Sequence, residues 1–341
     1  MEVIKRTCAG SKDVAREAGV SQATVSYVLN NTPNVKIKPE TRQLVLDVAK
    51  RLNYHTNVMA RGMRLKKSEC IGVVTGRTMS SSAFMNVLEG IRESLSERNY
   101  SITLCLPPSE SSMEYIKYFN SRLIDGVIFA FMNLTDEERQ ALADNGVPYV
   151  MINALADEDA RFQVRTGIGD AMAEAVEYLV ENGAKEIGYL GRMTGNLGRR
   201  RYSNFVGAMD KQGIKINEDL IYKISRNEDL QENEIENFFK QREKPPRALF
   251  CEGINASMHI LRYAYKNNIK VPVEMSVIAV GTSQHSSGLC PALSAIEAPL
   301  YEMGQTGVRM LFSQLDGIDY PDSQEDDVVI LEWEFIRRES C

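Results

Sequence analysis

The sequence is poor in the residue patterns that build metal, disulfide and membrane sites. Its six cysteines include no CxxC pair, and its three histidines (His55, His259 and His285) lie far apart, whereas zinc sites need closely spaced ligands. No apolar run approaches the roughly eighteen residues that span a membrane, and the first residues lack the apolar segment of a signal peptide. We therefore expect no metal, no cofactor, no membrane partner and a cytoplasmic location.

Enzyme motifs are also missing. The segment "GYLGRMTGNLG" lacks the Gly-Lys-Ser/Thr ending of a phosphate-binding loop, and "GIGDAM" lacks the third glycine or alanine of a dinucleotide-binding turn. No serine, histidine and acid occur in the context of a nucleophile. The adjacent Asp326 and Asp327 belong to a charged run typical of a solvated loop. We expect no catalytic residues and no enzyme.

Charge is distributed unevenly along the 341 residues, whose net charge is −6. Residues 1–67 contain thirteen Lys or Arg against five Asp or Glu, a net charge of +8, so the remaining residues carry −14. Basic side chains gain affinity for DNA by displacing counterions from phosphates. The basic head predicts nucleic-acid binding, although a merely solvated basic surface gives the same charge.

The segment "SKDVAREAGVSQATVSYVLNN" predicts two short helices that meet at Gly19, since glycine readily takes the left-handed conformation that ends a helix. Ser21 is a good N-cap for the second helix. A third helix, at about 40–52, begins next to Pro39. By helical spacing, we expect a small core formed by Val14, Ala18, Val25, Val28, Leu29, Leu44, Val45 and Val48.

The other face of the second helix is then free to lie in a major groove, as the recognition helix of a helix-turn-helix does. A plain helical hairpin has the same pattern and stays an alternative. The next segment, 57–65, is basic and able to form a helix, but it has too little apolar surface to fold alone. The candidate DNA contacts in the head are Ser21, Gln22, Ala23, Thr24, Ser26, Tyr27 and Asn30.

From Ile71 onward, short apolar runs alternate with amphipathic segments, which predicts α/β units with parallel sheets. The expected strands lie at 71–74, 102–106, 126–131, 147–152, 186–191, 220–224, 247–251, 275–280 and about 328–336. The expected helices lie at 84–98, 112–121, 136–145, 170–182, 200–212, 230–241, 255–266 and 300–314. Periodicity alone supports two α/β units.

The motifs "DVAREAGVSQATVSYVLNN", "ARGMR" and "IGVV" resemble the lactose-repressor (LacI/GalR) family of bacterial transcription regulators. The resemblance implies an all-α helix-turn-helix head and a periplasmic-binding-protein-like body of two lobes with doubly wound parallel sheets. The implied parts are a head at 1–56, a hinge helix at 57–68, and an effector-binding and dimerisation domain at 69–341. Its lobes would comprise about 69–163 plus 293–324, and about 164–292 plus 325–341.

The resemblance further implies a regulator, most often a repressor, that binds a palindromic operator as a homodimer under the control of a small-molecule effector. The hinge helix would insert Met63 into the minor groove, with Asn57 and Ala60 beside it. Because no heptad-bearing tail follows the last expected strand, we expect a dimer and not a tetramer. An exported solute receptor would share the body but would need a signal peptide.

The expected effector site departs from the sugar-binding members of the family, which place Asp and Asn in three loops. Here those loops carry Gly167, Ile168, Gly253, Ile254, Gly281 and Thr282. Arg201 matches the family's effector-contacting arginine, and Arg77 precedes a serine-rich helix start that suits an anion. The candidate effector contacts are Arg77, Ser80, Ser81, Ser82, Phe84, Arg201, Glu252 and Thr282.

Arg201 has no obvious counter-ion in the sequence, and an unpaired buried guanidinium is costly. We therefore expect an effector that bears a carboxylate or phosphate. Control by a protein partner, in place of a small molecule, is the alternative.

Overall fold

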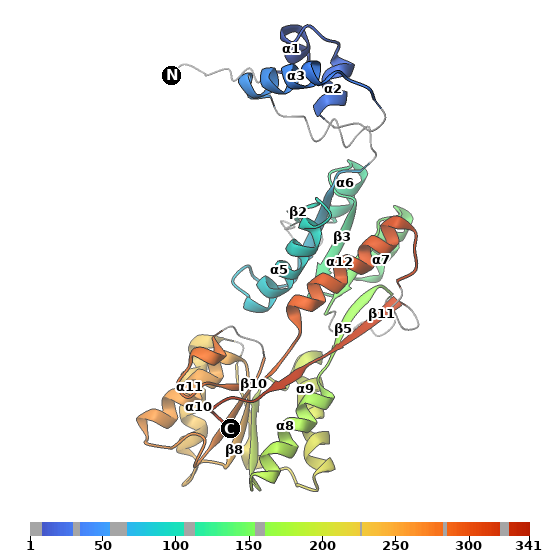
Figure 1. Ribbon diagram of the computed structural model, residues 1–341. Helices are drawn as coiled ribbons and strands as arrows, with labels where there is room; N and C mark the ends of the chain where they lie inside the picture. Colours follow the sequence, from blue (N-terminus) through green and yellow to red (C-terminus); the bar gives the residue numbers. More distant parts are fainter. Residues whose placement is uncertain are drawn as a thin grey trace, which may run out of the picture. The chain divides into compact units, whose positions relative to one another are not determined.

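A computed structural model describes residues 9–29, 35–54, 67–105, 113–153, 161–225, 227–281, 285–320 and 327–341. The chain forms two compact units, Met1–Ser68 and Glu69–Cys341 (Figure 1), called here the head and the body. None of the helices in the described ranges combines the length and the apolar composition that a membrane span requires. Five candidate site residues lie outside the described ranges: Asn30, Asn57, Ala60, Met63 and Thr282.

The head contains the three expected helices, α1 (Ser11–Glu17), α2 (Gln22–Leu29) and α3 (Pro39–Arg51). Gly19 has a φ of +65°, which confirms the left-handed turn between α1 and α2. The hydroxyl oxygen of Ser21 accepts a hydrogen bond from the amide of Thr24 at 3.1 Å, so Ser21 caps α2 as expected.

The core of the head follows the predicted pattern with one exception. Its buried residues are Val14, Ala15, Ala18, Val25, Val28, Val45, Val48 and Ala49, and Leu29 packs partly against them. The expectation that Leu44 joins this core is wrong, because its exposed fraction is 47%. Successive helical residues are about 100° apart, and the buried face of α3 that includes Val45 and Ala49 leaves Leu44 at its outer edge.

The first lobe of the body is built on a six-stranded sheet with the order β11-β5-β4-β3-β1-β2. All its strand pairs are parallel. Apolar side chains of α5 and α12 pack on one face and those of α6 and α7 on the other. The elements are β1 (Cys70–Thr75), α5 (Ser82–Ser96), β2 (Ser101–Leu104), α6 (Glu114–Asn120), β3 (Gly126–Ala130), α7 (Asp136–Asp144), β4 (Tyr149–Ile152), β5 (Gln163–Gly167), α12 (Leu300–Asp316) and β11 (Val328–Glu332).

The second lobe has a six-stranded sheet with the order β12-β10-β9-β8-β6-β7, in which only the described pair β10 and β12 is antiparallel. Helices α8 and α9 cover one face and α10 and α11 the other (Figure 1). The elements are α8 (Gly169–Glu181), β6 (Ile187–Gly191), α9 (Gly195–Lys211), β7 (Ile221–Lys223), α10 (Glu228–Lys240), β8 (Ala248–Glu252), α11 (Ile254–Lys266), β9 (Ser276–Val280), β10 (Ser294–Glu297) and β12 (Glu334–Ile336).

Two strands, β5 and β10, were not expected from the sequence. Each is short and carries polar residues, so neither forms an apolar run of the kind that marks a buried strand. Strands β5 and β11 belong to the first sheet, and β10 belongs to the second. The expected lobe limits at 163, 293 and 325 are therefore wrong: the first lobe includes β5 and β11, and the second lobe includes β10. The chain passes between the lobes after β5, after β10 and after β11 within the described residues.

Candidate DNA-binding face and effector pocket

The exposed face of α2 carries three of the expected DNA contacts. Gln22, Ala23 and Tyr27 are exposed, whereas Val25 and Val28 on the other face are buried. The side-chain amide of Gln22 donates to the hydroxyl of Ser11 at 3.1 Å, which orients it beside the start of α1. The structure therefore brings these polar and aromatic groups together on one side of the helix.

Ser21 and Thr24 have a structural task in addition to any DNA contact. Their hydroxyl oxygens lie 2.9 Å apart in a hydrogen bond, and Ser21 also caps α2. Ser26 is partly buried. The side chains best placed to reach a base edge are therefore Gln22 and Tyr27.

Arg201 of α9 does not stand unpaired in the body. Its Nη1 atom lies 3.8 Å from Oε2 of Glu252, at the end of β8, and its side chain is only 11% exposed. The expectation that this arginine lacks a counter-ion is therefore wrong. Sequence analysis did not identify this pair, because the two residues are far apart in the chain and only the fold of the second lobe brings them together.

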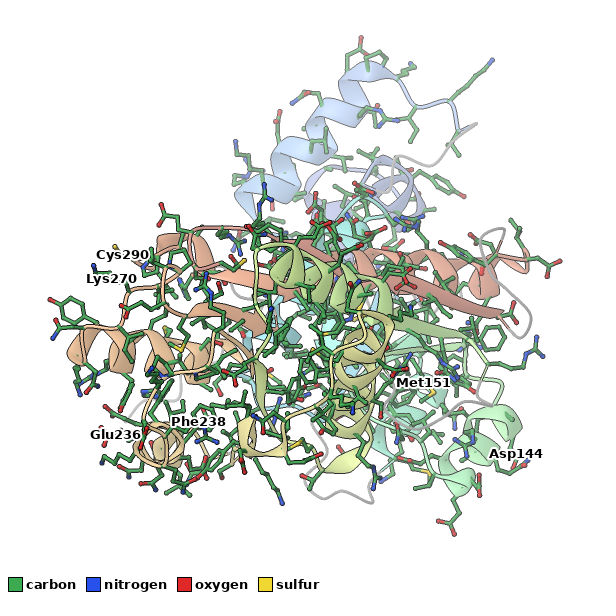
Figure 2. The ribbon with its side chains drawn as sticks, turned by 90° about the horizontal axis from the view of Figure 1, so that it is seen from below. Asp144, Met151, Glu236, Phe238, Lys270 and Cys290 are labelled. Atoms are coloured by element: carbon green, nitrogen blue, oxygen red, sulfur yellow. The ribbon has the colours of Figure 1, made fainter. Side chains whose placement is uncertain are left out.

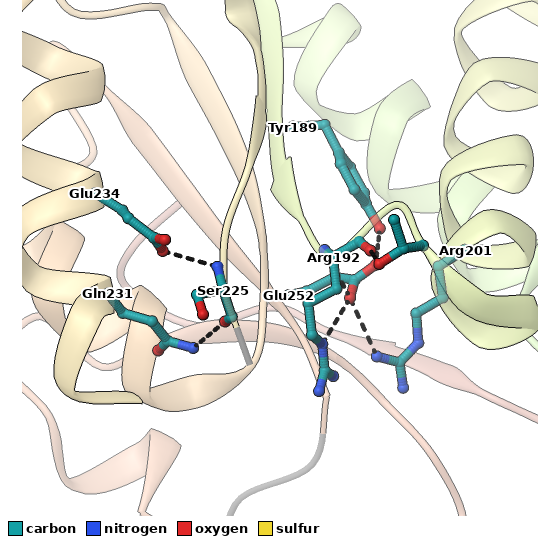
Figure 3. A network of polar contacts seen from close by, with 8 residues as sticks. Tyr189, Arg192, Arg201, Ser225, Gln231, Glu234 and Glu252 are labelled. Atoms are coloured by element: carbon teal, nitrogen blue, oxygen red, sulfur yellow. Dashed lines mark hydrogen bonds and ion pairs between the residues drawn. The ribbon is translucent and has the colours of Figure 1, made fainter. Parts of the chain in front are cut away.

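Glu252 is 2% exposed and accepts several hydrogen bonds (Figure 3). The hydroxyl of Tyr189 donates to Oε1 at 2.6 Å. The backbone N–H and the Nε–H of Arg192 donate to Oε2 at 3.3 and 3.4 Å. A buried carboxylate is tolerated when it is paired and hydrogen-bonded in this way.

Burial is the main cause of the pKa shifts of Arg201 and Tyr189. Desolvation lowers the pKa of Arg201, while the negative charge of Glu252 opposes that shift. Desolvation also raises the pKa of Tyr189 well above its usual value, and the neighbouring Glu252 raises it further. Tyr189 is thus a stable hydrogen-bond donor to the carboxylate at neutral pH.

A pocket beside Arg201 collects residues from both lobes and from the chain crossings. The guanidinium of Arg201 lies 5.1 Å from the ring centroid of Trp333, which is 6% exposed and sits between β11 and β12. The Nε–H groups of Arg201 and Trp333 are buried without a hydrogen-bond partner among the described residues. The pocket is lined by Asn153, Thr166, Ile168, Leu197, Arg200, Arg201 and Trp333.

The serine-rich start of α5 is separate from that pocket lining. Ser81 caps α5 by accepting a bond from the amide of Phe84 at 3.4 Å, and Ser80 bonds the hydroxyl of Thr78 at 3.0 Å. Ser82 is exposed, and the guanidinium of Arg77 lies 5.4 Å from the ring centroid of Phe131. Phe84 is fully buried in the core, and its role as an effector contact stays a prediction.

Sequence reasoning had not selected Tyr189, Arg192 or Trp333. Tyr189 lies inside an apolar strand, where a tyrosine is expected to be a core residue. Arg192 follows that strand and belongs to no recognisable motif. Trp333 is the sole tryptophan of the chain, and its position shortly before the last strand was the one available signal.

Comparison with known proteins agrees with this architecture. The pattern described as "Bacterial regulatory proteins, lacI family" matches residues 12–57, and that of a "Periplasmic binding protein-like domain" matches residues 176–341. The HTH-type transcriptional regulator RegA of Clostridium acetobutylicum is 31% identical, over 98% of this chain and 99% of that protein. The chain belongs to the LacI family of bacterial regulatory proteins.

Two further comparisons fit this LacI-family chain. Catabolite control protein A of Staphylococcus epidermidis is 29% identical over 88% of this chain and 90% of that protein. A crystal structure of the lac repressor dimer, bound to operator and an anti-inducer, has a TM-score of 0.80 at 21% identity, covering 97% of this chain and 98% of that one. The expected fold class is confirmed, and the protein is a DNA-binding transcriptional regulator.

Proposed function

We propose that this LacI-family regulator represses transcription by binding a palindromic operator as a homodimer, and that a small molecule in the pocket beside Arg201 controls that binding. The carrying observation is the exposed face of α2, where Gln22, Ala23 and Tyr27 stand clear of a packed core. The net charge of +8 on residues 1–67 supports DNA binding.

A twofold-symmetric pair of heads would read two half-sites about one helical turn apart or a multiple of it. The effector would act by binding two states of the body with different affinity, which shifts their populations. This role requires no chemical step, and the protein would act in the cytoplasm, where its DNA lies. The assignments of Met63, Asn57 and Ala60 to a hinge helix remain predictions.

The test is selection of bound DNA from a random pool with the full-length protein. We expect an enriched palindrome, with two chains per duplex measured by light scattering of the complex. Enrichment of a single half-site bound by one chain would contradict the dimer, and the absence of any enriched sequence would contradict specific regulation. Repeating the selection with metabolite fractions would identify an effector by its effect on binding.

A further inference from the structure

The carboxylate of Glu252 occupies the carboxyl end of β8, and ligands of open α/β sheets bind at that edge. The neighbouring strand β6 ends at Gly191, where an added Cβ atom would lie only 3.0 Å from the carboxyl carbon of Glu252. A side chain at position 191 would therefore clash with the ring of Tyr189, 2.4 Å from the added Cβ atom, and with the carboxylate. The absence of a side chain at Gly191 therefore leaves room for the buried carboxylate of Glu252, which places a negative charge of the protein itself at this edge.

Each arginine around this carboxylate already contacts at least one acceptor, although the Nε–H group of Arg201 has none among the described residues. Arg192 and Arg201 both contact Oε2 of Glu252 (Figure 3). The exposed Arg200 donates from Nη2 to the carbonyl of Thr166 at 3.3 Å. An incoming anion would have to compete for guanidinium groups that are already engaged, and it would approach a buried carboxylate of the same sign.

Two buried N–H groups of the pocket still lack an acceptor among the described residues, Nε of Arg201 and Nε1 of Trp333. Buried donors are normally hydrogen-bonded, and leaving them unpaired costs free energy. The rest of the lining offers apolar contact from Ile168 and Leu197. Two free N–H donors beside apolar side chains suit an uncharged ligand whose oxygen atom accepts hydrogen bonds.

We propose that Glu252 sets the ligand class of this pocket. It acts as an internal anion on Arg201, so that carboxylates and phosphates are excluded and an uncharged ligand bearing acceptor oxygens is admitted. The proposal rests on the proposed effector role of the pocket, and it replaces the anionic effector expected from the sequence.

The test uses fluorescence, because Trp333 is the single tryptophan of the chain and lines the pocket. Full-length protein is titrated with sodium sulfate, and sodium chloride at equal ionic strength serves as the blank. We expect no saturable response from the wild type and sulfate binding at least about tenfold tighter in Glu252→Gln, where the carboxylate no longer neutralises Arg201. Equal responses from the two proteins, including none from either, would overturn the proposal.

Two matched variants separate charge from packing. Glu252→Asp keeps the negative charge and should exclude sulfate as the wild type does; a gain equal to that of Glu252→Gln would assign the effect to packing and reject the proposal. Glu243→Gln removes an exposed carboxylate after α10 and should gain nothing; a gain would show a nonspecific effect of net charge and count equally against it.

If Glu252→Gln does not fold, as judged by circular dichroism, the wild-type titration still decides. A saturable response to millimolar sulfate would overturn the proposal, and no response would support it. Binding of the selected operator is measured in parallel. Failure of the wild-type protein to bind this operator would count against the proposed function. The sulfate titration reports only on the pocket in the body, so its result does not depend on DNA binding by the head.

Discussion

At the scale of single residues, we expect substitutions of Arg201 and Glu252 to have non-additive effects on the free energy of unfolding, because the two side chains form a buried ion pair. Arg201→Gln leaves a buried carboxylate with fewer partners, so we expect it to lower the free energy of unfolding by about 3–5 kcal/mol. The double variant with Glu252→Gln removes both charges and should be more stable than Arg201→Gln alone. Urea unfolding of the four proteins gives the coupling energy.

If the change in unfolding free energy of the double variant equals the sum of the two single changes, the two side chains do not stabilise each other and the prediction is wrong. A matched control is the exposed i,i+3 pair of Arg92 and Glu89, for which the same cycle should give a much smaller coupling because water screens exposed charges.

The buried thiol of Cys251 predicts a loss of stability in alkaline solution. Desolvation raises the pKa of Cys251 from 9.0 to about 12. Above about pH 9 the unfolded chain therefore loses this proton while the folded chain keeps it, so stability falls as pH rises from 9 towards 12. The contribution approaches about 1.4 kcal/mol per pH unit.

Urea unfolding at several pH values checks this slope, which should be shallower in Cys251→Ala than in the wild type. Cys290 is exposed at the edge of the second lobe (Figure 2), and Cys290→Ala should leave the pH dependence unchanged. Identical slopes in Cys251→Ala and the wild type would show that this thiol does not contribute.

At the scale of elements, the close packing of α5 against α12 depends on glycines. A Cβ atom added at Gly304 would lie 2.2 Å from the carbonyl oxygen of Val87, and one at Gly90 would lie 2.0 Å from that of Tyr301. Because backbone atoms would have to move, we expect Gly304→Ala to destabilise the body by at least about 2 kcal/mol. The change is measured as a shift in the urea midpoint.

The control for this effect is Gly207 of α9, where an added Cβ atom would meet nothing within 4 Å. Gly207→Ala should stabilise the protein by about 0.5–1 kcal/mol through helix propensity. A mild effect of both substitutions would show that α5 and α12 can separate without cost.

At the scale of the whole molecule, the exposed face of α2 predicts how operator recognition changes. Gln22→Ala and Tyr27→Ala should each lose about 1–3 kcal/mol of discrimination at the base pairs they contact. Binding should weaken steeply as salt rises, since the head neutralises phosphates. Quantitative gel shifts on the selected operator and on a scrambled duplex measure both quantities.

Leu44 provides the matched control, because it is exposed on α3 and not on α2. Leu44→Ala should leave the ratio of cognate to scrambled binding unchanged. An unchanged ratio in both α2 variants would instead mean that another part of the protein reads the sequence.

The sequence by itself determined the local features of this protein. Gly19, Ser21 and the spacing of Val25 and Val28 specify the helix-turn-helix because turn conformation, capping and amphipathic packing act over a few residues. The alternation of apolar runs with amphipathic segments likewise determined most strands and helices of the body, since strands buried on both faces form continuous apolar runs and each helix buries one face.

Only the tertiary structure decided which distant groups meet. β5 and β10 carry too little apolar sequence to be recognised, and they become strands because neighbouring strands supply their hydrogen bonds. Glu252 becomes the partner of Arg201 because β8 ends at the edge of the second lobe where α9 begins. Charge neutralisation in a buried site depends on distance through space and not on separation along the chain, which is why the sequence alone did not reveal Glu252 as the counter-ion of Arg201.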